Sequence, residues 1–396
     1  MKQKDLQHVF IIGCKGIPAR YGGFETFVDR LTAYQKDRSI RYHVACACEP
    51  EAYRRENARF TYHGADCVTF PWHKIGPARA VTYDLEALRF FLHEAQKRRI
   101  AHPVFYILAC RIGPFIRHVK RRVDALGGRL YINPDGHEFL RAKWAPPIRR
   151  YWKYSEKQMV GAADLVICDS KNIQAYIKRE YAPLKPKTVY IAYGAEPADA
   201  GQGSDEKTEA LRGWYAAHGL KARQYYLVVG RFVPENNYET MIREFMRSDT
   251  TKTFVLITDV SDGFLQKLKQ RTGFDRDARI CFAGTVYDQA ILKEIRKNAY
   301  AYFHGHEVGG TNPSLLEALA CTDLNLLLDI GFNREVAADT ACYWTKEKGD
   351  LAALIDRADR MDPQKIRALG VRARARMADC YSWESIAQRY EETFSG

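Results

Sequence analysis

The amino-acid sequence predicts two doubly wound, Rossmann-like α/β domains, each a parallel sheet covered by helices on both faces. The first observation is length, because 396 residues exceed what one hydrophobic core usually holds. The second is an alternation of short apolar strands with helical stretches, which restarts after a segment containing Gly and Pro at 194–207. We expect residues 1–193 and 194–375 to form two domains facing across a cleft, with 376–396 a helix packing back on the first domain.

In the first domain each predicted strand is a short apolar run, and each predicted helix is an amphipathic stretch between two such runs. The strands are expected at residues 9–13, 42–48, 67–70, 104–109, 130–132, 165–168 and 189–192. The helices are expected at residues 24–34, 80–98, 114–126, 148–162 and 172–181. Because parallel strands end at one edge of a sheet, the loops that follow these strands are the first candidates for a ligand site.

The second domain repeats the same alternation. Its strands are expected at residues 225–229, 254–258, 280–283, 300–303, 326–328 and 342–344. Helices are expected at residues 238–246, 288–298 and 313–321, and a helical tail is expected from residue 363 onward. The last part of that tail, residues 381–394, is amphipathic, as expected for a helix that packs on a domain surface.

The stretch at residues 309–318 (GGTNPSLLEA) has the features of a ligand-binding helix start. Polar residues that cap helices precede Pro313, which suits the first helical position, and N–H groups at a helix start favour a phosphate. Glu317, about one turn into the helix, can accept two hydrogen bonds from a vicinal diol such as a ribose. The candidate nucleotide contacts are Gly310, Thr311, Asn312, Ser314 and Glu317. The alternative is an ordinary capped helix with a solvated Glu317.

The loop at residues 13–25 follows the first strand of the first domain. Its glycines, Gly16, Gly22 and Gly23, would let backbone N–H groups approach a phosphate closely. Their spacing is not the G-x-G-x-x-G fingerprint, and no acidic residue clearly ends the second strand, so a bound NAD is disfavoured. The alternative is a glycine turn that is needed only for packing.

The loop at residues 230–237 (GRFVPENN) follows the first strand of the second domain. Arg231 is therefore expected at the carboxyl end of a strand, facing the cleft, where its guanidinium can bind a diphosphate in a bidentate way. The alternative is a surface arginine in a strand–helix turn.

The loop at residues 133–143 (NPDGHEFLRAK) also follows a strand of the first domain. Asp135, His137 and Glu138 lie within four residues, a combination that suits orientation of an acceptor hydroxyl or general acid–base chemistry. The same residue types also bind metals, but no second ligand cluster is apparent in the sequence, so we expect no metal ion.

The chain has the composition of a soluble globular protein. It contains no run of 18 apolar residues, and its first residues lack a cleavable signal pattern, so a cytoplasmic location is expected. Its ten cysteines follow no metal-ligand spacing and are expected to be free thiols in a reducing compartment.

The formal charge of +13 attracts anionic lipid, nucleic acid or phosphorylated substrates without choosing among them. Basic residues of the first domain are mixed with Trp and Tyr, as suits an anionic membrane surface. These residues are Arg111, Arg117, Lys120, Arg121, Arg122, Arg141, Lys143, Arg149, Arg150, Lys153 and Lys157, with Trp144, Tyr151, Trp152 and Tyr154. A solvated, salt-bridged helix face is the alternative. No nucleic-acid motif is present, so nucleic acid is not an expected partner.

Taken together, five motifs resemble those of two-domain glycosyltransferases of the GT-B type, family 4, and more narrowly the bacterial rhamnosyltransferases of that family. The motifs are GIPARYGGFET (16–26), NPDGHEF with RAKW (133–144), CDS (168–170), GRFVPENN (230–237) and GGTNPSLLEA (309–318). The resemblance implies a retaining transferase without a metal cofactor, whose donor is a nucleotide sugar such as dTDP-L-rhamnose. It implies a sugar acceptor on a polyprenyl diphosphate, used in cell-surface polysaccharide assembly at the inner face of the plasma membrane.

Two positions depart from the pattern of the broader family. The first glutamate of its E-x7-E motif falls on Gly309, with Glu307 nearby but out of register, while the second falls on Glu317. The family's diphosphate-binding lysine falls on Asn236, which leaves Arg231 as the main phosphate contact. A UDP- or GDP-sugar donor therefore stays an alternative. A non-catalytic, basic nucleic-acid-binding protein is the alternative from another class.

Overall fold

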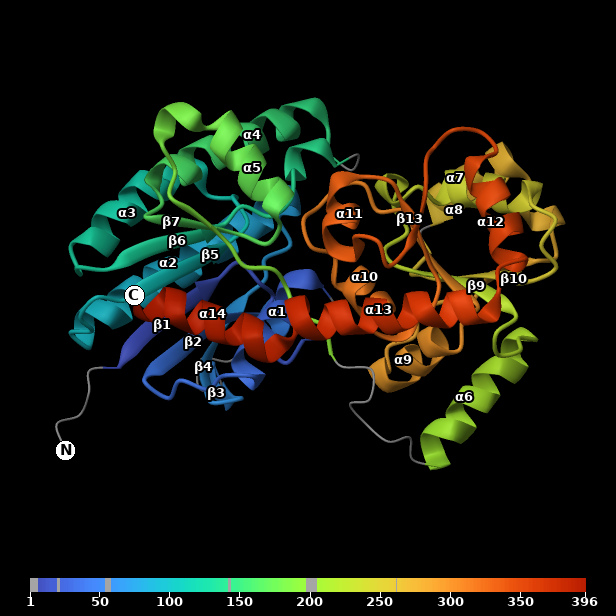
Figure 1. Cartoon of the computed structure of the whole chain (residues 1–396). Coiled ribbons are helices and arrows are strands. Elements are labelled where there is room, and N and C mark those ends of the chain that lie inside the picture. Colours follow the sequence, from blue (N-terminus) through green and yellow to red (C-terminus); the bar gives the residue numbers. More distant parts are fainter. Residues whose placement is uncertain (1–5, 20–21, 54–57, 142–143, 197–204, 261) are drawn as a thin grey trace. The chain divides into compact units, whose positions relative to one another are not determined.

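The computed structural model describes residues 6–19, 22–53, 58–141, 144–196, 205–260 and 262–396, and it divides the chain into two compact units (Figure 1). Unit 1 comprises Met1–Gly194 and Trp383–Gly396, and unit 2 comprises Ala195–Ser382. Each unit has its own sheet, which confirms the predicted fold class. The return to unit 1 lies at Trp383 rather than at residue 376, because helix α13 (Pro363–Tyr381) is unbroken up to that point.

The sheet of unit 1 has the strand order β3-β4-β2-β1-β5-β6-β7-β8. All neighbours are parallel except the edge strand β3, which runs antiparallel to β4. The strands are β1 (Gln7–Ile12), β2 (Ile40–Cys48), β3 (Arg59–Tyr62), β4 (Ala65–Pro71), β5 (Val104–Leu108), β6 (Arg129–Asn133), β7 (Leu165–Cys168) and β8 (Thr188–Tyr190). Only β3 was not predicted, because its residues are largely exposed and form no apolar run.

The helices of unit 1 bury one apolar stripe each. In α2, for example, Tyr83, Ala87 and Phe91 follow the spacing of one helix face and are buried. The α-helices are α1 (Gly23–Ala33), α2 (Arg79–Lys97), α3 (Ile116–Asp124), α4 (Pro146–Ala162), α5 (Lys171–Glu180) and α14 (Trp383–Ser395). The 3-10 turns are η1 (Pro50–Ala52), η3 (Gly76–Ala78), η4 (Gly113–Phe115), η5 (Glu138–Leu140) and η6 (Ala182–Leu184).

The sheet of unit 2 is entirely parallel, with the order β11-β10-β9-β12-β13-β14. Its strands are β9 (Tyr225–Val229), β10 (Thr253–Ile257), β11 (Ile280–Phe282), β12 (Ala301–His304), β13 (Asn325–Leu328) and β14 (Cys342–Trp344). The order reverses direction at β9 and β12. This reversal is the switch point at which doubly wound sheets usually bind ligands, outside the carboxyl ends of the strands.

The helices of unit 2 include four that the sequence did not indicate: α6, α8, α11 and α12. The full set is α6 (Asp205–His218), α7 (Tyr238–Arg247), α8 (Asp262–Thr272), α9 (Gln289–Lys297), α10 (Pro313–Cys321), α11 (Gly331–Ala337), α12 (Asp350–Asp359) and α13, with 3-10 turns η7 (Pro234–Asn236) and η8 (Phe274–Arg276). Helix α6 begins within the segment that we predicted to be a linker at 194–207. Of that linker, residues 197–204 lie outside the described part of the chain.

Helix α14 completes the core of unit 1. Phe394 and Tyr390 are fully buried, and the Phe394 ring lies 5.6 Å from that of Tyr106 between centroids. The Tyr390 ring lies 5.0 Å from that of Phe27. At the helix end, the Phe394 carbonyl accepts a hydrogen bond of 2.8 Å from Arg129 Nη2. The last helix thus joins the strands and helices formed by the first 194 residues.

Among the described residues, no helix combines the length and the apolar character needed to cross a bilayer. The ten cysteines are all free, and six of them are buried.

We predict that Phe394→Ala lowers the free energy of unfolding by about 3–5 kcal/mol, because it removes a fully buried aromatic ring and leaves a cavity. Chemical denaturation of the full chain measures this change. The matched control is Val371→Ala on α13, whose side chain is 59% exposed and which should change stability little. Equal effects of the two substitutions would contradict the assignment of α14 to the core.

Candidate functional site

The start of helix α10 is built as the sequence predicts. Asn312 is the N-cap, and its Oδ1 accepts hydrogen bonds from the N–H groups of Ser314 (2.9 Å) and Leu315 (3.4 Å). Pro313 occupies the first helical position. One expectation needs correction, because the Ser314 amide already donates to the cap and is not available to a phosphate in this arrangement.

The Ser314 side chain is likewise used inside unit 2. Its Oγ donates to the Val229 carbonyl at the end of β9 (3.0 Å) and lies 2.8 Å from the Tyr302 hydroxyl. The Tyr302 hydroxyl donates to the same carbonyl at 3.1 Å. Ser314 therefore fixes the first turn of α10 against β9 and β12, and its predicted role as a direct ligand contact is replaced by a structural one.

The backbone of the loop before the cap is open to a ligand, as the sequence predicts. Gly309 has φ +146°, and a Cβ placed there would meet no atom within 4 Å, so the backbone borders open space. Gly310 is half-buried and Thr311 is buried. The backbone at Gly310, Thr311 and Asn312 is therefore the part of this stretch that is placed to receive an anion at the helix start.

Glu317 has a partner that the sequence did not reveal. Its Oε2 lies 2.7 Å from Nη2 of Arg296 on α9, whose side chain is only 4% exposed. The Glu317 side chain is 33% exposed, so the carboxylate is anchored on one side and accessible on the other. A carboxylate fixed in this way is suited to accept hydrogen bonds from a diol. Nothing in the sequence distinguishes Arg296 from the other basic residues of its helix.

Arg231 follows β9 directly and is exposed. Within the described part of the chain, its guanidinium forms no ion pair or hydrogen bond. Asn236 is 3% exposed, and its Nδ2 donates to the Arg231 carbonyl at 2.7 Å. Asn236 therefore shapes the turn that carries Arg231, and its predicted contact with the nucleotide sugar is corrected to this structural role.

The loops after β9 and β12 are tied to each other. Asn237 Nδ2 donates to the Gly305 carbonyl (2.8 Å) and to Glu307 Oε2 (3.2 Å). Glu307 also pairs with Lys346 at 2.5 Å, so its carboxylate is shared between Asn237 and Lys346. These bonds hold Arg231 and the α10 start in one assembly of loops within unit 2.

Two histidines stack on each other at the end of β12, one of them the last residue of the strand and the other in the loop that follows. The rings of His304 and His306 are 4.3 Å apart and nearly parallel. His304 is fully buried, and among the described residues neither of its ring nitrogens has a hydrogen-bond partner. Burial lowers the pKa of His304 to about 3, so the ring is neutral at physiological pH. Sequence reasoning gave neither histidine a role.

The glycine loop of unit 1 divides into structural and open positions. At Gly16, with φ +103°, a Cβ would lie 2.6 Å from Cys46, so this glycine is required for packing. Gly22 has φ +131° and caps α1, and a Cβ there would lie 1.9 Å from the Glu25 carboxylate. Gly23 alone borders open space. The packing alternative therefore holds for Gly16. At Gly22 the contact is with the movable end of the Glu25 side chain, so its predicted role at a phosphate stays a prediction. Arg20 and Tyr21 of the same motif lie outside the described residues.

The loop after β6 carries a strained backbone. Asp135 and His137 have φ +59° and +42°, and the Asn133 side chain holds the turn by accepting from the Asp135 N–H at 2.8 Å. Left-handed conformations at non-glycine residues cost energy and often occur at functional sites. The structure therefore singles out the same loop as the sequence does.

Arg141 organises the acidic residues of that loop. It is buried, forms an ion pair with Glu138 and lies 3.9 Å from Asp135 Oδ2. Trp144 Nε1 donates to the second oxygen of Glu138 at 2.9 Å. Glu138 is therefore engaged on both oxygens, and its role as an acid or base stays a prediction. Arg141 and Trp144 are likewise internal contacts rather than membrane contacts, and Lys143 lies outside the described residues.

Asp135 and His137 differ in their surroundings. Burial raises the pKa of Asp135, and the neighbouring Arg141 opposes that rise. The pKa of His137 is lowered by burial and then by Lys153 and Arg179, and its ring lies 4.4 Å from that of Tyr176. Asp135 is thus the carboxylate of this loop best suited to hold a substrate hydroxyl, and His137 is a neutral ring packed on α5.

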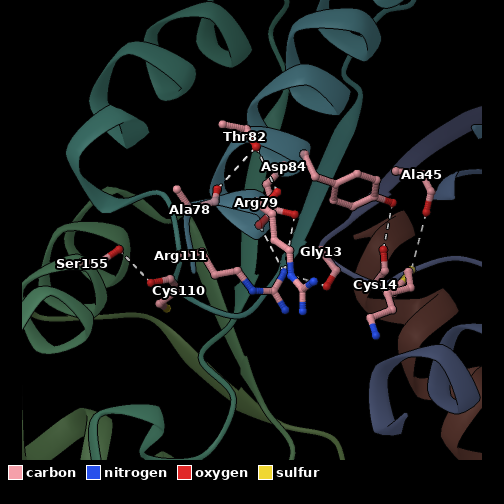
Figure 2. Close-up of polar contacts among 12 residues, drawn as sticks. Gly13, Cys14, Ala45, Ala78, Arg79, Thr82, Asp84, Cys110, Arg111 and Ser155 are labelled. Carbon is pink, nitrogen blue, oxygen red and sulfur yellow. Dashed lines mark hydrogen bonds and ion pairs between the residues drawn. The ribbon is translucent and has the colours of Figure 1, made fainter. Parts of the chain in front are cut away.

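Several basic residues predicted to contact a membrane instead pair within unit 1. Arg111 Nη1 donates to the Gly13 carbonyl and lies beside Asp84 (Figure 2). Lys120 lies 3.0 Å from Asp164, and Lys153 lies 2.8 Å from Glu180. Within the described ranges, no group of three or more His, Cys, Asp or Glu residues could hold a metal ion.

A family model described as "Domain of unknown function (DUF1972)" matches residues 6–196, which is nearly the whole first segment of unit 1. No curated protein matches the chain.

Solved structures match nearly the full chain at low identity. Sucrose-phosphate synthase from Thermosynechococcus elongatus has a TM-score of 0.75 at 17% identity, covering 98% of each chain. A trehalose-6-phosphate structure from E. coli, bound with UDP-2-fluoro glucose, has a TM-score of 0.72 at 11% identity, also covering 98% of each. Anabaena Alr3699/HepE in complex with UDP has a TM-score of 0.68 at 16% identity, covering 98% of this chain and 100% of that one. These likenesses establish the GT-B fold.

We predict that Glu317→Gln weakens nucleotide binding, and more for UDP than for dTDP, because a deoxyribose lacks one of the two hydroxyls that the carboxylate would accept. The loss of the Glu317 carboxylate also leaves the buried Arg296 without its partner. The larger change Glu317→Ala should therefore lower the free energy of unfolding by about 1–3 kcal/mol. Calorimetric titration and denaturation measure the two effects. Glu294→Gln, which alters a partly exposed pair with Lys297 at 3.8 Å, is the control. Unchanged affinity for both nucleotides would exclude Glu317 as the ribose contact.

Proposed function

We propose that this protein is a glycosyltransferase that uses a nucleotide-sugar donor. The observation that carries the proposal is the arrangement in unit 2. The exposed guanidinium of Arg231, which has no partner among the described residues, follows β9, and the capped start of α10 is bound to the end of that same strand. Glu317, anchored by Arg296, lies one turn further along the helix. A cation, a helix start and a diol-accepting carboxylate match a diphosphate joined to a ribose.

In this proposal, unit 2 binds the donor. The Arg231 fork and the backbone at residues 310–312 contact the diphosphate, and Glu317 contacts the ribose. Negative charge grows on the diphosphate as the bond between its oxygen and the anomeric carbon breaks. Fixed donors aimed at that charge stabilise the transition state more than the ground state.

Unit 1 binds the acceptor in this proposal. The acceptor oxygen forms the new bond to the anomeric carbon as the bond to the diphosphate breaks, and the electrons of that bond pass to the leaving phosphate oxygen. This oxygen also takes the acceptor proton, on the same face of the sugar, so the anomeric configuration is retained. Asp135 orients the acceptor hydroxyl. The raised pKa of its carboxyl favours a strong hydrogen bond from a neutral hydroxyl.

We further propose L-rhamnose from dTDP-L-rhamnose as the transferred sugar and a polyprenyl-diphosphate-linked sugar as the acceptor. The support for both is the resemblance of the motifs around Arg231, Glu317 and Asp135 to those of bacterial rhamnosyltransferases. A UDP-sugar is the second candidate, because two of the structurally similar proteins are described as bound to UDP or a UDP-sugar. Product masses from a panel of dTDP-, UDP- and GDP-sugars with lipid-diphosphate acceptors distinguish these donors.

A lipid-linked acceptor requires the protein to reach a membrane surface, and we propose that α3 and α4 of unit 1 provide the contact from the cytoplasmic side. These helices pack together. Some of the basic residues predicted to contact the membrane pair within unit 1. Those that are exposed and not paired in this way are Arg117, Arg121, Arg150 and Lys157. Phe115 and Tyr154, which are 47% and 52% exposed, add apolar surface. Each basic residue near an anionic bilayer contributes about 1 kcal/mol of attraction.

We predict that the protein pellets with vesicles containing phosphatidylserine at low salt and is released at high salt, because salt screens the attraction. Neutralising Arg117, Arg121, Arg150 and Lys157 with Gln should reduce pelleting. A matched variant neutralises four exposed cations of unit 2, namely Lys267, Arg276, Lys365 and Arg367, and should pellet like the parent. No pelleting at low salt, or equal loss in both variants, would refute this docking surface.

We predict that Arg231→Ala lowers sugar-transfer turnover by about two to three powers of ten, through loss of charge stabilisation on the leaving diphosphate. Stability should change little, because the side chain is exposed and unpaired among the described residues. Steady-state kinetics and thermal melting measure the two quantities. Arg367→Ala, an exposed arginine on α13, serves as the control. A folded Arg231→Ala protein with parental turnover would overturn the donor site.

A further inference from the structure

Arg111 stands at the carboxyl edge of the unit 1 sheet, three residues after β5 ends. The preceding Ala109 has φ +68°, which turns the chain sharply at this edge. The Arg111 carbonyl accepts a hydrogen bond of 2.6 Å from the Tyr151 hydroxyl on α4. Ser155, also on α4, donates to the Cys110 carbonyl at 2.7 Å. The backbone that carries this side chain is therefore fixed by two hydrogen bonds from α4.

The guanidinium is fixed as well, through one of its nitrogens. Figure 2 shows Arg111 between Gly13 and Asp84, with Nη1 directed at both. This nitrogen donates to the Gly13 carbonyl at 2.8 Å and to Asp84 Oδ2 at 3.2 Å. Gly13 directly follows β1 and Asp84 lies on α2, so groups from two elements converge on a single nitrogen.

The free-energy cost of burying the Asp84 carboxylate indicates that its pair with Arg111 does more than fill space in the core. Its side chain is fully buried, and burial raises its pKa to about 6 although Arg111 opposes that rise. Burying a carboxylate is expensive, and a buried ion pair seldom adds stability over apolar residues of the same shape. What the pair does provide is a guanidinium held in one orientation.

The rest of that guanidinium has no partner among the described residues. Arginine has five N–H donors, and only those on Nη1 are engaged. Nε and Nη2 have no hydrogen-bond partner within the described part of the chain, and the side chain retains 18% exposure. A planar, fixed edge with unsatisfied donors is the geometry that binds phosphate or carboxylate in a bidentate way.

Two further cations lie at the same edge. Lys15 follows Gly13 by two residues, and its Nζ lies 5.8 Å from the centre of the Trp72 ring. Arg79, in the first turn of α2, has its Cζ 5.4 Å from the same ring. Both side chains are exposed and have no carboxylate partner among the described residues. The Tyr83 hydroxyl links α2 to this loop by donating to the Cys14 carbonyl at 2.9 Å.

On its other side, Arg111 is near the acceptor loop. Asp135 and Glu138 both act on its charge, and Arg141 pairs with Glu138 and lies near Asp135. The cations at this edge, Arg111, Arg141, Lys15 and Arg79, outnumber the carboxylates of Asp84, Asp135 and Glu138 by one. Lys15 and Arg79, which have no carboxylate partner among the described residues, together with the open edge of Arg111 suit a diphosphate better than a single carboxylate.

We propose that Arg111, together with Lys15 and Arg79, binds the phosphate groups of a diphosphate ester while Asp135 holds the hydroxyl of the sugar attached to it. The inference rests on the proposed function, since it treats the diphosphate as part of the acceptor. A nucleotide-sugar donor carries the same chemical group, so the test must separate the two sources.

The test is calorimetric titration of inorganic pyrophosphate into the full chain carrying Arg231→Ala, which disables the proposed donor site of unit 2. In this background, adding Arg111→Lys keeps a charge beside Asp84 but loses the planar edge. It should weaken pyrophosphate binding about tenfold or more. The exposed-site change Lys15→Gln/Arg79→Gln should also weaken binding. Lys97→Gln, at the other end of α2, should leave it unchanged.

The double change Asp84→Asn/Arg111→Gln provides a second test, because it removes the cation without leaving a buried charge unpaired. Parental pyrophosphate affinity in this variant or in Arg111→Lys, in protein shown to be folded by circular dichroism, would overturn the proposal.

Transfer kinetics then separate the two sources of diphosphate. With Arg231 intact, Arg111→Lys should raise KM for a diphosphate-bearing acceptor about tenfold, and leave KM for the donor and for a phosphate-free acceptor analogue unchanged. A raised donor KM instead would assign the site to the donor and overturn the acceptor assignment. Absence of any transfer by the parent protein would contradict the proposed function, whereas the pyrophosphate titration tests the anion site independently of turnover.

Discussion

The candidate donor site depends on one backbone carbonyl, that of Val229 at the end of β9. It accepts hydrogen bonds from the hydroxyls of Ser314 on α10 and Tyr302 on β12. Parallel strands bring their carboxyl ends to the same edge, but they do not determine how a following helix is seated. This shared acceptor seats α10 on the sheet, and the positions of the capped helix start and of Glu317 follow from it.

A second constraint recurs in both units: three charged groups of the candidate sites each have a buried partner of opposite charge. Arg296 holds Glu317 and Asp84 holds Arg111, while Arg141 holds the acidic loop through Glu138. Such pairs contribute little net stability, since desolvation offsets most of the attraction. Their effect is orientation, because a side chain fixed before the ligand arrives loses less conformational entropy on binding.

The sequence was sufficient for the fold because strand and helix periodicities are local properties. Helix α10 has the predicted bounds, whereas the exposed edge strand β3 and the polar helix α8 gave no apolar pattern to detect. The loops that carry the site residues could be predicted from the ends of the strands, but the role of each residue could not. Ser314, Asn236 and Gly16 stand at the expected places, yet their contacts are with the protein itself. Arg111 was predicted to be a membrane-contacting cation because composition does not encode its long-range partners, the Gly13 carbonyl and Asp84.

The division of the chain has a consequence for biosynthesis. Unit 2 lies between the two segments of unit 1, and the side chains that fill the unit 1 core from α14 are synthesised after all of unit 2. Domains usually fold in order as they leave the ribosome. Here the first domain to emerge keeps an unfilled apolar surface around Phe27 and Tyr106 until Tyr390 and Phe394 arrive. The second domain, continuous in sequence, has all its residues available earlier, so we expect it to complete its core before the first domain does.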